Sequence, residues 1–198
     1  MPAVPLHAIT APESGTGKSY LADIASAIAT GDRCYVQSTA PDDPAETEKR
    51  LIGAALGGFP LIGLDNCNDG QGLSGDFLAQ LVERPNLQCR RLGRSDMVRL
   101  TNTFVVLANG NNVVLQADMV RRSIVCVLDA NCERPSGREF KHNPIEMVLA
   151  DRRRYVAAVL TIARGYIEAG RPGKLPPLPS FGPWSDLRAM RRVIGSVR

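Results

Sequence analysis

The sequence predicts an α/β fold in which a parallel β-sheet is flanked by helices. Short apolar runs rich in valine, isoleucine and leucine, which are typical of buried parallel strands, recur through the first two thirds of the chain. Segments with helical periodicity lie between these runs, and a glycine-rich segment separates the first run from the first helical segment. Strands that alternate with helices in this way are typical of a doubly wound parallel sheet.

Each element of this sheet is indicated by a local pattern. Strands are expected at residues 5–10, 34–38, 61–65, 104–108 and 124–128. A first helix is expected at residues 18–30, where the apolar residues share one helical face. A second helix begins at the capping pattern of Asp43, Pro44 and Glu46, and a third covers residues 75–83 and stops before a proline.

Two segments depart from the alternation of strands and helices. Residues 87–92 and 97–101 flank a Gly-Arg-Ser-Asp turn and predict a β-hairpin inserted into the core. After Pro144 the pattern becomes helical, with a long helix expected at residues 145–169, then a proline-rich loop and a last basic helix from about Trp184. We therefore expect an α/β core at 1–143 and a small helical C-terminal region at 144–198.

The charge of the chain is unevenly distributed. The 198 residues carry a net charge of +4, yet the segment from Ile145 to Arg198 alone holds ten basic and four acidic residues. Such an arginine-rich end is typical of a surface that faces nucleic acid or an acidic partner, and equally of a solvated basic helix.

The sequence contains no pattern that indicates a membrane protein or an exported one. A run of about 18 apolar residues is absent, and the first residues lack the basic start and apolar core of a signal peptide. A cytoplasmic protein without a membrane partner is therefore expected. Five scattered cysteines without a CxxC pair indicate buried free thiols rather than a zinc site or disulfides.

The glycine-rich segment has the composition and context of a phosphate-binding P-loop. It follows the first strand and opens the first helix, so its backbone N–H groups and the helix N-terminus would face phosphate oxygens. Lys18 would reach the β- and γ-phosphates of ATP, and the Ser19 hydroxyl would bind Mg²⁺. The nucleotide-contacting residues are expected to be Pro12, Glu13, Ser14, Gly15, Thr16, Gly17, Lys18, Ser19 and Tyr20. Pro12 replaces the first glycine of the usual pattern.

A second part of such a site is expected where the third strand ends. Asp65 closes an apolar strand and would hold the magnesium ion. Asn66 stands where many ATPases carry a glutamate that polarises the attacking water. An amide can orient water but cannot take its proton, so either turnover is slow or another acid, such as Asp69, serves.

Polar amides follow the fourth strand of the predicted sheet. Ligands of such sheets bind at the carboxyl ends of the strands, so an amide there can reach the γ-phosphate or the attacking water. Asn111 is the first candidate and Asn109 the second, although the same residues also favour a simple turn.

An arginine pair precedes the last strand. Arg121 and Arg122 could extend to the γ-phosphate of a neighbouring subunit and stabilise charge in the transition state. A surface pair near the end of a helix is the alternative interpretation.

The order of these motifs resembles that of AAA+ ATPases, in which Walker A, Walker B, sensor 1 and an arginine finger follow one another. The hairpin between Asp65 and Asn111 is similar to the pre-sensor hairpin of superfamily 3 and MCM-like helicases. The likeness is greatest to the helicase part of primase-helicases carried by prophages and integrative elements, and it extends through Glu139-Phe140 and Asn143-Pro144 to about Asp186.

The resemblance implies a motor domain of a DNA replication helicase. It would hydrolyse ATP with Mg²⁺ and move on single-stranded DNA as a homo-oligomeric ring, typically a hexamer, or together with the primase domains of a parent protein. Asn111 would act as the sensor and Arg122, with Arg121, as the finger. The hairpin residues that would contact DNA phosphates are Arg90, Arg91 and Arg94.

Two other functions are compatible with the same motifs. A truncated motor could bind ATP and DNA without hydrolysing or unwinding anything. A P-loop kinase of small metabolites is a further alternative, but the hairpin, the sensor amides and the paired arginines argue against it.

Overall fold

The computed structural model describes residues 3–40, 43–67, 72–90, 96–173 and 176–188. Its centre is a five-stranded sheet with the order β2-β3-β6-β1-β7, in which all neighbouring strands are parallel. These strands are β1 (Leu6–Ala11), β2 (Tyr35–Ser38), β3 (Leu61–Asp65), β6 (Val105–Asn111) and β7 (Ser123–Val127). The predicted α/β class with a parallel sheet is confirmed.

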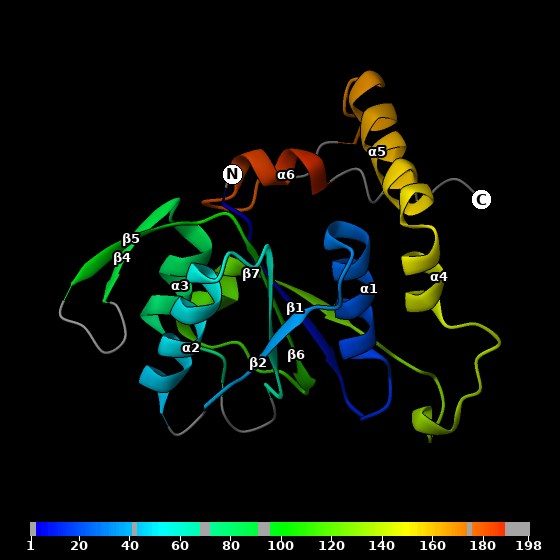
Figure 1. Ribbon diagram of the computed structural model, residues 1–198, viewed down its shortest axis with the longest axis horizontal. Coiled ribbons are helices and arrows are strands. Elements are labelled where there is room, and N and C mark those ends of the chain that lie inside the picture. Colours follow the sequence, from blue (N-terminus) through cyan, green and yellow to red (C-terminus); the bar gives the residue numbers. More distant parts are fainter. Residues whose placement is uncertain (1–2, 41–42, 68–71, 91–95, 174–175, 189–198) are drawn as a thin grey trace.

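Helices cover both faces of the sheet. On one face lies α1 (Lys18–Thr30), with α4 (Pro144–Ala150) and α5 (Arg152–Glu168) packed outside it (Figure 1). On the other face lie α2 (Pro44–Leu56) and α3 (Asp76–Glu83), and the 3-10 helix η1 (Ala117–Arg122) packs against α3. The inserted hairpin is also present as an antiparallel pair, β4 (Asn86–Arg90) and β5 (Met97–Thr101).

The helix expected at residues 145–169 is two helices, because the chain breaks at Asp151. The backbone of Asp151 has left the helical region, with φ −139° and ψ 57°, and its carboxylate accepts a hydrogen bond from the N–H of Arg154 at 3.4 Å. Aspartate favours such local bonds over a helix interior, so Asp151 ends α4 and caps α5.

The C-terminal region shares its core with the sheet. Phe181 is fully buried in the same apolar cluster as Leu6 and Leu64, just before α6 (Gly182–Arg188). Trp184 meets His7 of β1 edge to face, with ring centroids 5.8 Å apart. Residues 176–186 therefore pack against the sheet, and the boundary between 143 and 144 stays a prediction.

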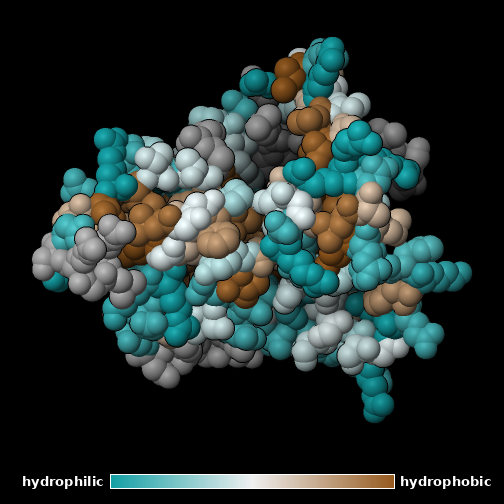
Figure 2. Space-filling model, in the orientation of Figure 1, coloured by the Kyte–Doolittle hydropathy of each residue, from teal (hydrophilic) through white to brown (hydrophobic). Residues whose placement is uncertain are grey.

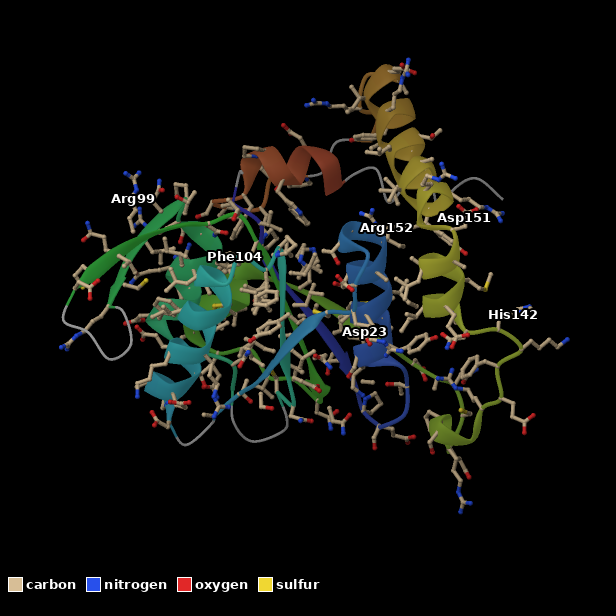
Figure 3. The ribbon with its side chains drawn as sticks, viewed as in Figure 1. Asp23, Arg99, Phe104, His142, Asp151 and Arg152 are labelled. Atoms are coloured by element: carbon tan, nitrogen blue, oxygen red, sulfur yellow. The ribbon has the colours of Figure 1, made fainter. Side chains whose placement is uncertain are left out.

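α5 also contacts the far end of α1. The guanidinium of Arg152 donates to the carbonyls of Ile28 and Ala29, at 2.9 Å and 2.7 Å, in the last turn of α1 (Figure 3). Those carbonyls have no hydrogen-bond donor within their own helix and carry the partial negative charge of its C-terminus. The guanidinium of Arg152 supplies both the donors and a compensating positive charge.

Most of α5 is exposed. Tyr166 is its one buried residue, and apolar side chains are visible on the surface at the α5 end of the molecule (Figure 2). The exposed apolar residues of this helix are Val159, Leu160, Ile162 and Ile167. Within the part of the chain that is described, no helix is both long and apolar enough to cross a membrane.

The five cysteines are free thiols, but they differ in burial. Cys34, Cys67 and Cys89 are buried, whereas Cys126 is half-buried and Cys132 is exposed. The expectation of buried thiols is therefore wrong for Cys132, which lies in the irregular segment after β7. Among the described residues no group of three or more His, Cys, Asp or Glu side chains could hold a metal ion.

We predict that Phe181→Ala destabilises the whole protein by about 3–5 kcal/mol, because the truncation leaves a cavity in the shared core. Denaturant unfolding followed by circular dichroism measures the change. Val159→Ala on exposed α5 is the control, with an expected change of less than about 0.5 kcal/mol. A Phe181→Ala protein with the stability of the wild type would show that the C-terminal region does not support the core.

Candidate functional site

The glycine-rich loop joins β1 to α1 through two left-handed glycines. Gly15 has φ 75° and Gly17 has φ 97°, a region that residues with a Cβ rarely adopt. Gly17 directly precedes α1, and no side chain caps the helix there. The first N–H groups of α1 are thus left free for an anion, as the P-loop prediction requires.

Lys18 is held inside this loop. Its ammonium donates to the carbonyl oxygen of Glu13 at 2.9 Å and to the hydroxyl of Thr16 at 3.1 Å. Burial lowers the pKa of Lys18, and the nearby carboxylate of Asp65 acts in the opposite direction. The ammonium thus lies within the loop, and the negative charge of Asp65 at the end of β3 stabilises its protonated form.

Asn109 joins the loop to that acid. Its side-chain amide nitrogen donates to the hydroxyl of Ser19 and to the carboxylate of Asp65, at 2.7 Å in each case. Asn109 is buried, with 4% of its surface exposed. A single amide therefore fixes the two oxygen atoms that the sequence assigns to Mg²⁺.

The strand register explains why these three residues meet. β6 lies between β1 and β3, and Ala108 of β6 pairs with Leu64 of β3, so Asn109 is level with Asp65. The chain after β3 then crosses the end of β6, where the N–H of Cys67 donates to the carbonyl of Asn109 at 3.1 Å. A Cβ on Gly110 would lie 2.3 Å from the carbonyl oxygen of Cys67, so only glycine fits under this crossing.

Several of the other predicted residues line the hollow around the amide of Asn109. The hollow has a volume of about 320 Å³, and Ser14, Tyr20, Asn66 and Asn111 are part of its lining. Pro12 is exposed on the loop. Of the two candidate sensors, Asn109 contacts the oxygens of Ser19 and Asp65 that are expected to bind Mg²⁺, whereas Asn111 lies two residues further along β6 and also lines the hollow.

Asn66 has an unusual backbone conformation. Its φ is 58°, its N–H donates to the carboxylate of Asp65 at 2.8 Å, and the residue is exposed. Asparagine tolerates the left-handed region better than most residues with a Cβ. A glutamate would adopt this backbone conformation less readily than the asparagine that is present.

The donor set suits magnesium. Ser19 offers a hydroxyl and Asp65 a carboxylate, and both are hard oxygen ligands of the kind that Mg²⁺ uses together with phosphate oxygens and water. The hollow beside them has room for phosphates. The residues therefore fit the expected ion.

The arginine pair is divided between two environments. Arg122 is buried and forms ion pairs with Glu83 of α3 and with Asp118, including a 2.8 Å bond from its Nε to Glu83. Arg121 is exposed and pairs with Asp118. The predicted reach of Arg122 toward a neighbour does not agree with its internal pairs, so Arg121 is the better placed of the two and the finger stays a prediction.

Of the hairpin arginines expected to contact DNA, one is among the described residues. Arg90 is exposed as the last residue of β4, whereas Arg91 and Arg94 lie outside the described residues. The hairpin itself is confirmed, and its DNA contacts stay a prediction.

One segment beside the loop has no counterpart in the sequence motifs. Between β7 and α4 the chain forms the 3-10 helix η2 (Pro135–Gly137), and a Cβ on Gly15 would lie 2.8 Å from the Cβ of Ser136. Arg138 donates to the carbonyl of Thr16 at 3.1 Å. These contacts join residues more than a hundred positions apart, which is why no local pattern could have indicated them.

The parallel sheet, the glycine-rich loop that opens α1 and the acid that ends β3 together make this a P-loop fold. The NrS-1 C-terminal region, in its A form apo structure, is similar over 77% of this chain, with 16% identity and a TM-score of 0.49. The X-ray structure of JCV helicase is similar over the whole chain, with 12% identity and a TM-score of 0.43.

This chain spans 35% of the first structure and 52% of the second, so what those whole proteins bind or do is not transferred to it. No family model and no curated protein matches the sequence.

We predict that Gly110→Ala destabilises the protein by about 1–3 kcal/mol, because the methyl group would force the Cys67 crossing away from β6. Gly53→Ala in the interior of α2 is the matched control, since nothing lies within 4 Å of its Cβ position. That variant should gain about 0.5–1 kcal/mol from the better helix propensity of alanine. Thermal unfolding of both variants checks the pair, and equal effects would contradict the close approach at Gly110.

Proposed function

We propose that the chain is the ATP-binding and ATP-hydrolysing motor domain of a DNA replication helicase, acting on single-stranded DNA as an oligomeric ring. The observation that carries the ATPase part is the link from Ser19 through Asn109 to Asp65, beside the ammonium of Lys18. A structural loop has no need for a buried amide that orients a hydroxyl and a carboxylate toward the same hollow.

The chemistry follows from these groups. Phosphates of ATP would accept hydrogen bonds from the N–H groups of the loop and of the first turn of α1. Lys18 would exchange its bonds to Glu13 and Thr16 for bonds to phosphate oxygens, which carry full charge and bind an ammonium more strongly. Ser19 and Asp65 would hold Mg²⁺, which neutralises charge on the transferring phosphoryl group.

The helicase part rests on the arrangement of the motifs. The β4–β5 hairpin lies in the chain between β3 and β6, the two strands that supply Asp65 and Asn109. Its basic end would contact DNA phosphates without reading sequence. Arg121 at the end of η1 is exposed, and it would exchange its ion pair with Asp118 for a phosphate of a neighbouring subunit.

A non-catalytic ATP- and DNA-binding module is the second candidate, and Asn66 is the observation that favours it. The amide cannot take a proton from water, and its left-handed backbone opposes replacement by glutamate. A small-molecule kinase is less well supported, because such an enzyme would have no use for the β4–β5 hairpin.

We predict that the purified chain hydrolyses ATP. Turnover should be faster with single-stranded DNA and should rise steeply with protein concentration. Lys18→Ala should lower turnover about 100-fold or more, because it removes the cation that faces the phosphates. The control is Lys49→Ala on the exposed surface of α2, which should leave turnover unchanged.

The outcome separates the candidates. ATP binding without turnover at any protein concentration would favour the non-catalytic module. Unchanged hydrolysis by Lys18→Ala would contradict the site itself.

We also predict that Arg94→Ala and Arg90→Ala weaken binding of single-stranded DNA and spare ATP binding. Each variant should reduce the slope of log affinity against log salt by about 1, because one phosphate contact is lost. Arg164→Ala is the control, since that side chain is exposed on α5 beside Glu168. Fluorescence anisotropy across a salt series gives the slopes, and an unaltered affinity at low salt would remove the hairpin from the DNA site.

A further inference from the structure

The site shows on which side of the glycine-rich loop the nucleoside would lie. Asp65 on β3 and Asn109 on β6 stand on one side of β1 in the sheet, and β7 stands on the other. The metal and the terminal phosphate belong to the β3–β6 side. The other end of a bound nucleotide is therefore directed toward the β7 side, where residues 129–143 run from β7 past the loop to α4 (Figure 1).

That segment is fixed to the loop and to α1 at three points. Ser136 packs directly on Gly15, and Arg138 donates to the carbonyl of Thr16 at 3.1 Å. At its end, Asn143 accepts a hydrogen bond from the hydroxyl of Tyr20 in the first turn of α1. The segment is thus held directly beside the glycine-rich loop and the first turn of α1.

Phe140 lies on this segment with its ring largely exposed. It is 71% exposed, and the guanidinium carbon of Arg138 is 5.3 Å from the centroid of its ring. Phe140 is two positions after Arg138 in sequence, and an extended chain covers at most about 3.6 Å per residue, so its backbone is within about 7 Å of the residue bonded to the loop. A single exposed apolar residue needs no explanation, but this ring is held by a cation that itself binds the P-loop.

We infer that Phe140 is the stacking platform for the base of the bound nucleotide, and that Arg138 holds the ring beside the phosphate loop. The inference rests on the proposed nucleotide site and adds the group that recognises its base. A flat aromatic ring attracts any nucleobase through its π face, so the ligand class is a nucleoside triphosphate. The two ends of the ligand are then recognised by different segments, the phosphates by residues 13–19 and the base by Phe140.

Two ligands that share phosphates but differ in the base separate these roles. Isothermal calorimetry with Mg²⁺ compares ATP and inorganic tripolyphosphate on the full chain and on Phe140→Ala, Phe140→Trp and Lys18→Ala. Phe140→Ala should weaken ATP about five- to 150-fold, the range that alanine substitution of a stacking ring gives, and leave tripolyphosphate unchanged. Phe140→Trp should restore ATP binding, whereas Lys18→Ala should weaken both ligands.

Leu160→Ala is the matched control, because Leu160 is a similarly exposed apolar residue (63%) on α5. It should change neither affinity. Unchanged ATP binding by Phe140→Ala, or an equal loss for both ligands, would overturn the platform while the phosphate site stands. A wild-type chain that binds neither ligand would instead overturn the proposed function.

Discussion

The amide of Asn109, bonded at once to Ser19 and Asp65, is the interaction on which the proposed chemistry depends. A side-chain amide has two N–H donors on one nitrogen, and both are used here. An aspartate at this position could donate to neither oxygen and would place a second negative charge beside Asp65. The link fixes a hydroxyl from α1 and a carboxylate from β3 before any ligand arrives, so no reorganisation of these groups is needed on binding.

That link imposes its own conditions on the fold. The sheet must place β6 between β1 and β3, so that the strand carrying the amide has the loop on one side and the acid on the other. The chain leaving β3 then passes over β6 and bonds to the backbone of Asn109 itself. Gly110 permits this approach because it has no Cβ. A side chain there would displace both the amide of Asn109 and the carboxylate of Asp65.

The sequence predicts the strands and the loop well, because apolar runs bounded by polar turns and a glycine-rich loop are local patterns. It favours Asn111 over Asn109 as the sensor, whereas the register of β6 with β3 brings Asn109 against Asp65 and Ser19, a contact that no local pattern indicates. Nor does it show that Arg122 is internal, since its partner Glu83 is 39 positions away. The break at Asp151 is visible only in retrospect, because a capping aspartate and an aspartate on a helix surface look alike in sequence.

Both ends of α1 are hydrogen-bonded to the C-terminal part of the chain. Asn143, the cap of α4, holds Tyr20 in its first turn, and Arg152 of α5 holds the carbonyls of its last turn, about 20 Å away along 13 residues. The two contacts therefore couple the position of α1 to that of α4 and α5. A displacement of α5 would therefore be felt at the last turn of α1, and a shift of its first turn, next to the glycine-rich loop, would be felt at Asn143.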